Sequence, residues 1–163
     1  MGAVSLKKKN REINFAPLFF VAGILGMGAV VADSGIGGEV ADLLVSALPL
    51  TYDNPMGNFL SLAAAALGTG VITTLPGVPA VLTPIADRLA QVTGLPLETV
   101  LMTQVIGFST IIFPYQSPPL LVALQIAGVG IAPALRLCLA LTAVTLLLLV
   151  PIDYLWWRYL NWI

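Results

Sequence analysis

Apolar residues fill four long stretches of the chain, and charged residues and turns separate these stretches. A helix needs about 20 mainly apolar residues to cross the hydrocarbon core of a bilayer, and the stretches approach or exceed this length. The pattern therefore predicts an all-α integral membrane protein, with a cytoplasmic segment at residues 1–14 and a membrane domain at 15–163. The expected elements are a helix, an interrupted segment, a broken helix and a final helix, at residues 15–48, 57–92, 98–131 and 133–155.

The composition of the chain supports a membrane protein and argues against a nucleic-acid partner. Of the 163 residues, 58% are hydrophobic and 9% are charged, and the mean hydropathy is +0.98, which lies outside the range of soluble domains. The net charge is −1, and a nucleic-acid partner would require a basic surface. We therefore expect a lipid bilayer around the protein and no nucleic acid bound to it.

The two ends of the chain predict its orientation. Lys7, Lys8, Lys9 and Arg11 precede the first apolar stretch, and basic flanks lie on the cytoplasmic side. Aromatic residues gather near the C-terminus, as expected at a membrane interface: Tyr154, Trp156, Trp157, Tyr159 and Trp162. The expected location is the cell (inner) membrane, with several crossings, a cytoplasmic N-terminus and an outer C-terminus.

Enzymatic chemistry is not expected. The chain has no histidine and one cysteine, Cys138, which excludes a Cys/His metal site and a disulfide framework. No nucleophile with a neighbouring base is apparent either. We expect no enzyme activity and no cofactor.

The second apolar segment is interrupted by "TTLPGVP" at residues 73–79. About 15 residues lie on either side, and at about 1.5 Å per residue each half reaches roughly 22 Å, short of a core of about 30 Å. The segment is therefore one long kinked crossing or a re-entrant hairpin that returns to the face it entered. The distribution of Lys and Arg favours the crossing.

The third segment has no charged residue from 99 to 135 and is interrupted by "FPYQSPP" at 113–119. Prolines there predict two half-helices joined by unwound chain. Such chain is tolerated at membrane depth where it is buried in protein or lines a cavity. Gln104 and Gln125 are expected to form hydrogen bonds between helices.

Both interruptions carry groups that suit a binding site. Ser117 and Pro118 have the pattern of a helix start, an N-cap hydroxyl followed by proline at the first helical position, which would aim free N–H groups at the break. In the other interruption Thr73 and Thr74 offer hydroxyls, and Gly77 allows close approach of the backbone. Transporters use discontinuous helices of this kind to hold anions and Na⁺. The other interpretation is that the prolines only kink the helices.

The stretch "VLTPIADRLAQVTGLPLETVLMTQVIGFSTIIFPYQSPPLLVALQIAGVG" resembles the second half of the divalent anion/sodium symporter family, a branch of the ion transporter superfamily. The resemblance rests on elements at residues 82–85, 94–96 and 114–119 and extends from residue 15 onward. These are elevator-type carriers of dicarboxylates, citrate and sulfate, built from two inverted repeats. The chain is similar to the C-terminal repeat.

The resemblance implies that 57–92 is a re-entrant hairpin whose tip faces the loop of the broken helix. In the family these two loops clamp Na⁺ and touch the anionic substrate, and possible Na⁺ ligands here are Thr73, Thr74 and Ser117. The family has Ser-Asn-Thr at the tip, where this chain reads "ITTLPG", and Leu120 occupies the place of a common asparagine. The expected binding residues are Thr73, Thr74, Gly77, Gln116, Ser117 and Pro118.

The expected function is secondary active transport of a small dianion, coupled to Na⁺ or H⁺. A single repeat is expected to work as an oligomer, with the N-terminal half of the transporter or another copy of the chain. The alternative is a non-transporting membrane subunit or truncated remnant whose helix breaks only shape packing.

Overall fold

The computed structural model describes residues 36–52 and 54–163 and, before them, residues 19, 22, 23, 26, 30 and 34. The predictions for segment 1–14 and for most of 15–35 lie outside these residues. The described part is helical and contains no strand, which agrees with the predicted all-α class.

The described elements follow one another with short connections. In chain order they are α3 (Ile36–Ala47), α4 (Pro55–Ile72), α5 (Gly77–Leu82), the 3-10 turn η1 (Thr83–Ile85), α6 (Ala86–Thr93), α7 (Leu97–Ser109), the 3-10 turn η2 (Pro114–Gln116), α8 (Pro118–Ala127), α9 (Ile131–Val144), the π-helical segment η3 (Thr145–Leu149) and α10 (Val150–Tyr159).

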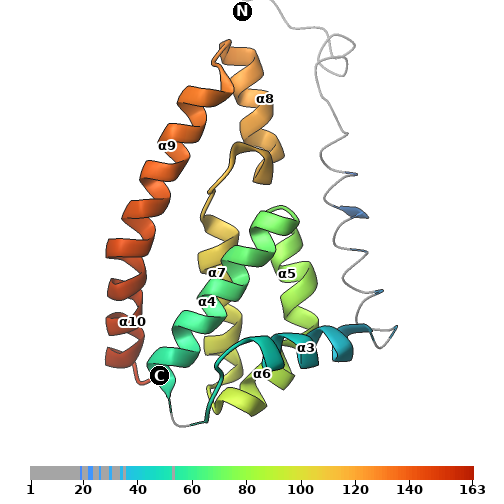
Figure 1. The fold of residues 1–163 in the computed structure, drawn as a ribbon, viewed down its shortest axis with the longest axis vertical. Helices are drawn as coiled ribbons and strands as arrows, with labels where there is room; N and C mark the ends of the chain where they lie inside the picture. The colour runs from blue at the N-terminus through green and yellow to red at the C-terminus, as the bar shows by residue number, and fades with distance from the viewer. Residues whose placement is uncertain are drawn as a thin grey trace, which may run out of the picture.

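The second segment folds into a hairpin. Helix α4 begins with Pro55 in its first turn, and the Asn54 side chain accepts a hydrogen bond from the Gly57 amide at 2.9 Å. The chain reverses after α4, and α5, η1 and α6 run back beside it (Figure 1). At the open end, the buried Asn58 side chain donates to the carbonyl oxygen of Thr93 at 3.1 Å. The kinked crossing favoured by the Lys and Arg distribution does not describe this segment, because its two ends lie together.

Helix α7 packs against both arms of the hairpin. The contact with α4 is close, because a Cβ on Gly107 would lie 2.5 Å from the carbonyl oxygen of Ala66. Apolar residues of α4 to α7 form the larger buried cluster: Leu62, Ala66, Val78, Leu82, Ile85, Ala86, Leu89, Leu95 and Val100. The hairpin and α7 therefore form the packed centre of the described fold.

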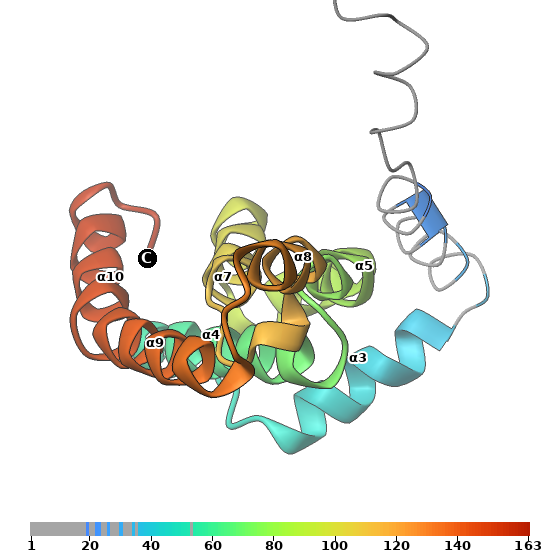
Figure 2. The ribbon, with the colours of Figure 1, turned by 90° about the horizontal axis from the view of Figure 1, so that it is seen from above.

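The third segment is broken as its prolines predict. Helix α7 ends at Ser109, the chain passes through η2, and α8 continues beyond the hairpin (Figure 1). Gly128 adopts a left-handed conformation with φ of 64°, which lets the chain turn back into α9. Helices α9 and α10, joined through η3, then return along the whole length of the fold, and Figure 2 shows them standing apart from α5.

Two helices of the described part are long and apolar enough to cross a membrane: Pro55–Ile72, with 18 residues, and Ile131–Tyr159, with 29. At about 1.5 Å per residue, the longer helix measures about 43 Å. It leaves many large apolar side chains exposed, including Leu137, Leu141, Leu147 and Leu148.

Helix α3 lies across the foot of the hairpin in Figure 1 and contacts η1 and α6. Its acidic residues Glu39 and Asp42 are exposed. Asp42 forms an ion pair with Arg88 of α6, with 3.4 Å between the two side chains. The foot of the fold therefore carries charge, whereas α4 and the stretch from α7 to α8 carry little.

Candidate functional site

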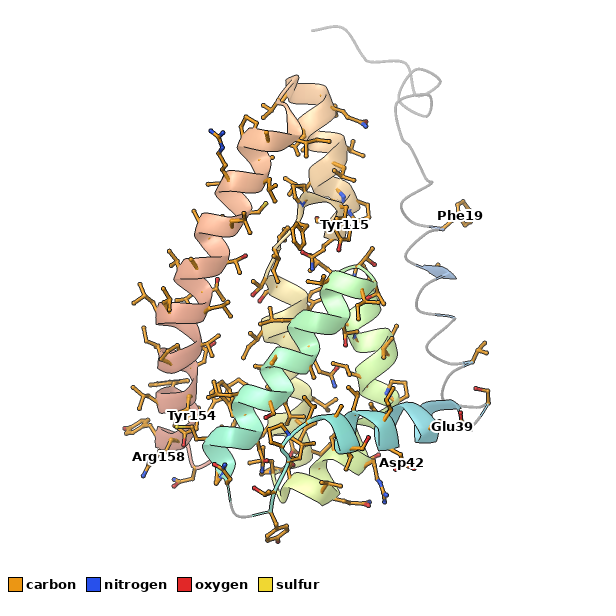
Figure 3. The ribbon with its side chains drawn as sticks, viewed as in Figure 1. Phe19, Glu39, Asp42, Tyr115, Tyr154 and Arg158 are labelled. Atoms are coloured by element: carbon orange, nitrogen blue, oxygen red, sulfur yellow. The ribbon has the colours of Figure 1, made fainter. Side chains whose placement is uncertain are left out.

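The hairpin tip and the break in the third segment meet. The backbone amide of Leu75, in the tip, donates to the carbonyl oxygen of Gln116, in the break, at 3.0 Å. A second contact joins the same segments, because the Tyr115 hydroxyl donates to the carbonyl oxygen of Val71. Figure 3 shows Tyr115 beside the end of the hairpin. The structure thus brings together the two interruptions that the sequence predicts as one site.

The Gln116 side chain holds the unwound chain in shape. It is fully buried, and its Oε1 accepts hydrogen bonds from the backbone amides of Ile112 and Phe113 at 2.8 and 2.7 Å. Its Nε2 has no hydrogen-bond partner, although it is buried. A Cβ on Gly70 would lie 3.3 Å from this nitrogen, so the amide faces the last turns of α4. A buried amide without a partner is costly and is uncommon in folded proteins.

At the tip, Thr73 is used internally. Its hydroxyl donates to the carbonyl oxygen of Thr69 at 2.7 Å. A Cβ on Gly77 would lie 2.4 Å from the same hydroxyl oxygen, so the absent side chain of Gly77 makes room for Thr73. The predicted role of Gly77 in close approach therefore concerns its own hairpin. The Thr73 oxygen keeps an unused lone pair, since a hydroxyl both donates and accepts.

The start of α8 differs from the prediction. Ser117 occupies the N-cap position, but its hydroxyl makes no capping hydrogen bond. Pro118 and Pro119 have no N–H, and the amides of Leu120 and Leu121 donate to the Ser117 carbonyl oxygen at 3.0 and 3.3 Å. The expectation of free N–H groups at this helix start is therefore wrong, because the two prolines remove two donors and the helix itself uses the next two.

Several polar groups at the junction remain available. Among the described residues, no hydrogen bond involves the hydroxyl of Thr74 or that of Ser117, and the Thr74 amide is also without an acceptor. Both residues are partly exposed. No charged residue occurs between residues 54 and 86 or between 99 and 135. The junction therefore offers neutral donors and acceptors: those of Thr74, Ser117 and Gln116.

Three cavities in the described part of the chain lie against α7, and none of them is lined by the six predicted residues. One of about 390 Å³ separates α7 from η3 and α10. One of about 270 Å³ lies between α5, η1 and α7. One of about 220 Å³ lies where α7, the break, α8 and α9 approach. The tip and break residues pack on one another in this structure.

Gln104 is expected from the sequence to form a hydrogen bond between helices. Its Oε1 accepts a hydrogen bond from the Thr83 hydroxyl at 2.8 Å, which joins α7 to η1. Gln125 is exposed and makes no side-chain hydrogen bond within the described part of the chain. The sequence interpretation missed Tyr115 and Leu75. Tyr115 lies between the prolines of "FPYQSPP", and its hydroxyl in an unwound apolar stretch is a sequence signal that could have identified it. Leu75 contributes only its backbone amide, so its residue type carries no such signal.

The described residues contain no group of three His, Cys, Asp or Glu side chains that could hold a metal ion. Oxygen ligands for Na⁺ at the junction would be hydroxyls and carbonyls. Comparison of the chain with protein-family models, curated proteins and solved structures finds no match.

Proposed function

We propose that this chain is a membrane carrier, similar to the C-terminal repeat of a divalent anion/sodium symporter. It would move a small dianion, such as a dicarboxylate, citrate or sulfate, by secondary active transport coupled to Na⁺ or H⁺. The observation that carries the proposal is the contact between hairpin tip and helix break, where Leu75 donates to Gln116. Discontinuous segments that meet within an apolar fold are the arrangement that transporters use for binding.

The chemistry of the junction supports an anion as the substrate. The hydroxyls of Thr74 and Ser117 and the buried Nε2 of Gln116 are donors without acceptors. Neutral donors in apolar surroundings stabilise an anion strongly, because little water competes for them. The same hydroxyl oxygens and the unwound carbonyls can contact Na⁺, which would neutralise part of the charge.

The membrane setting is supported by the surface of the long helix α9–α10. Its apolar side chains point outward along most of its length, which is unfavourable in water and favourable in lipid. The chain reverses direction between α4 and α5, beside the break in the third segment. In a bilayer this hairpin would re-enter and leave by one face, with its tip buried in protein as the backbone requires.

The second candidate is a non-transporting membrane subunit, and one observation favours it. The Thr73 hydroxyl donates to, and the Gln116 Oε1 accepts from, backbone groups of their own segments. The predicted residues also line none of the three cavities described above. In that case the breaks would shape helix packing and nothing would bind between them. The two candidates differ in whether the junction hydroxyls contact a ligand.

Binding of succinate and of sulfate to the purified full-length chain, with and without NaCl, tests the proposal. We expect Thr74→Val and Ser117→Ala each to weaken binding about 10- to 100-fold, because losing one hydrogen bond to a charged ligand costs about 1.5–3 kcal/mol. Thr69→Val is the matched control, since the Thr69 hydroxyl donates within α4 to Ala65 at 2.8 Å. Affinity for succinate and sulfate that is the same in Thr74→Val, Ser117→Ala and the wild type would favour the non-transporting subunit.

A further inference from the structure

The largest of the three cavities lies between α7 and the long helix, away from the hairpin tip. Its volume is about 390 Å³, within the range of small-molecule sites. Its polar lining residues are Asp153, Ser109, Thr110 and Thr145. The hydroxyls of Ser109 and Thr110 donate to the carbonyl oxygen of Ile106 at 3.5 and 2.6 Å. The remaining lining residues are apolar: Met102, Val105, Ile106, Leu149 and Trp157.

Asp153 has no countercharge among the described residues that line this cavity. The ion pair found within the described part of the chain joins Arg88 and Asp42, at the foot of α3 and α6. Among the described residues, no basic side chain lines the cavity. Asp153 is half-buried, and the buried Trp157, four residues further along the helix, lines the same cavity. A carboxylate against an apolar wall is unfavourable unless a cation or a hydrogen-bond donor pairs with it. The cavity therefore favours a positively charged group at this end.

The cavity is elongated along the helices. Thr145 and Asp153 lie eight residues apart on one wall, which corresponds to about 12 Å along a helix. Met102 and Thr110 have the same separation in sequence on the other wall, which α7 forms as far as Ser109. The first of these walls includes the π-helical segment η3, a feature found often at functional sites. A ligand would meet a carboxylate at one end, hydrocarbon along its middle and hydroxyls at the other end.

We propose that this cavity binds an organic amine with an apolar body. Its ammonium group would donate to the Asp153 carboxylate, its hydrocarbon would contact Val105, Ile106 and Leu149, and its far end would approach the Thr145 hydroxyl. A metal cation fits less well, because it needs several oxygen ligands within about 2.6 Å on all sides, and this lining is mostly carbon. The inference uses none of the junction residues, so it stands or fails separately from dianion transport.

Equilibrium dialysis of hexylammonium against the full-length chain in non-ionic detergent tests the inference. We expect saturable binding, weakened 10- to 100-fold by Asp153→Asn, since a charge-assisted hydrogen bond contributes about 1.5–3 kcal/mol. Asp153→Glu should keep binding within a few-fold. Asp87→Asn is the matched control, because Asp87 is exposed on α6 and lines none of the three cavities. Hexan-1-ol should bind at least 10-fold more weakly than hexylammonium.

Three results would overturn the inference. One is equal binding by the wild type and Asp153→Asn, which would mean partition into micelles. Another is displacement of hexylammonium by an equal concentration of NaCl, which would indicate an alkali-cation site. The third applies if Asp153→Asn does not fold. Val105→Trp fills the cavity and leaves the carboxylate in place, so this variant should abolish binding. Binding of hexylammonium by Val105→Trp would contradict the inference.

Discussion

Asn58 and Thr93 are 35 positions apart in the chain, and the side-chain nitrogen of Asn58 donates to the Thr93 carbonyl oxygen at 3.1 Å. The same nitrogen donates to the carbonyl oxygen of Thr51 at 2.6 Å, and the Asn58 Oδ1 accepts from the Thr51 amide at 3.0 Å. One fully buried amide thus closes the open end of the hairpin and ties it to the chain that enters it.

Asn58→Ala tests this closure. The change would leave the Thr51 amide and the carbonyl oxygens of Thr51 and Thr93 without their partner, and we expect the free energy of unfolding to fall by about 2–4 kcal/mol. Denaturant unfolding in detergent measures the loss. Asn54→Ala removes an exposed helix cap and should cost about 1 kcal/mol. Similar losses for the two variants would show that the closure contributes no more than a cap.

The buried Gln116 side chain makes a second prediction. Gln116→Leu would leave the amides of Ile112 and Phe113 without the Oε1 acceptor, so the unwound chain should open more readily. We expect hydrogen exchange at these two amides to accelerate by at least 10-fold, which corresponds to about 1.4 kcal/mol. Gln125→Leu, at an exposed position of α8, should leave their exchange unchanged. Unchanged exchange in Gln116→Leu would mean that other contacts fix the break.

The close contact of α7 with α4 predicts opposite effects for two glycines. A Cβ at Gly107 would overlap Ala66, and Gly107→Ala should destabilise the fold by about 1–3 kcal/mol. A Cβ at Gly68 would meet nothing within 4 Å, and Gly68→Ala should be neutral or stabilise by up to about 1 kcal/mol. Thermal unfolding of both variants measures the difference. A stable Gly107→Ala would contradict the close helix approach.

The sequence predicts the places where the helices stop, because proline and glycine act locally. Pro76 and Gly77 mark the hairpin turn, and Pro114 and Pro118 bound the break. The direction of the chain after the turn could not be predicted in the same way. A kinked crossing and a hairpin have the same local pattern, and the difference depends on contacts such as that between Asn58 and Thr93, which are distant in the chain.

The candidate site shows the same division. Hydroxyl and amide residue types identify Thr74, Ser117 and Gln116, and their positions beside prolines place them in unwound chain. Which atoms are already used depends on the folded neighbours. The Gln116 Oε1 accepts hydrogen bonds from the amides of Ile112 and Phe113. The Ser117 hydroxyl has no partner among the described residues, because the first available amides of α8 donate to the Ser117 carbonyl oxygen instead. Sequence therefore predicts the candidates, and hydrogen bonding selects among them.

Topology tests the central claim most directly, since a re-entrant hairpin requires both of its ends on one face of the membrane. In a Cys138→Ser background, single cysteines at the exposed positions Tyr52, Gln91 and Val129 would be treated with a membrane-impermeant thiol reagent in intact cells. We predict labelling at 52 and 91, the two ends of the hairpin, in intact cells, and at 129, in the α8–α9 turn, only after the cells are opened. Labelling of 52 together with 129 in intact cells, and of 91 only after the cells are opened, would contradict the hairpin and the site built on it.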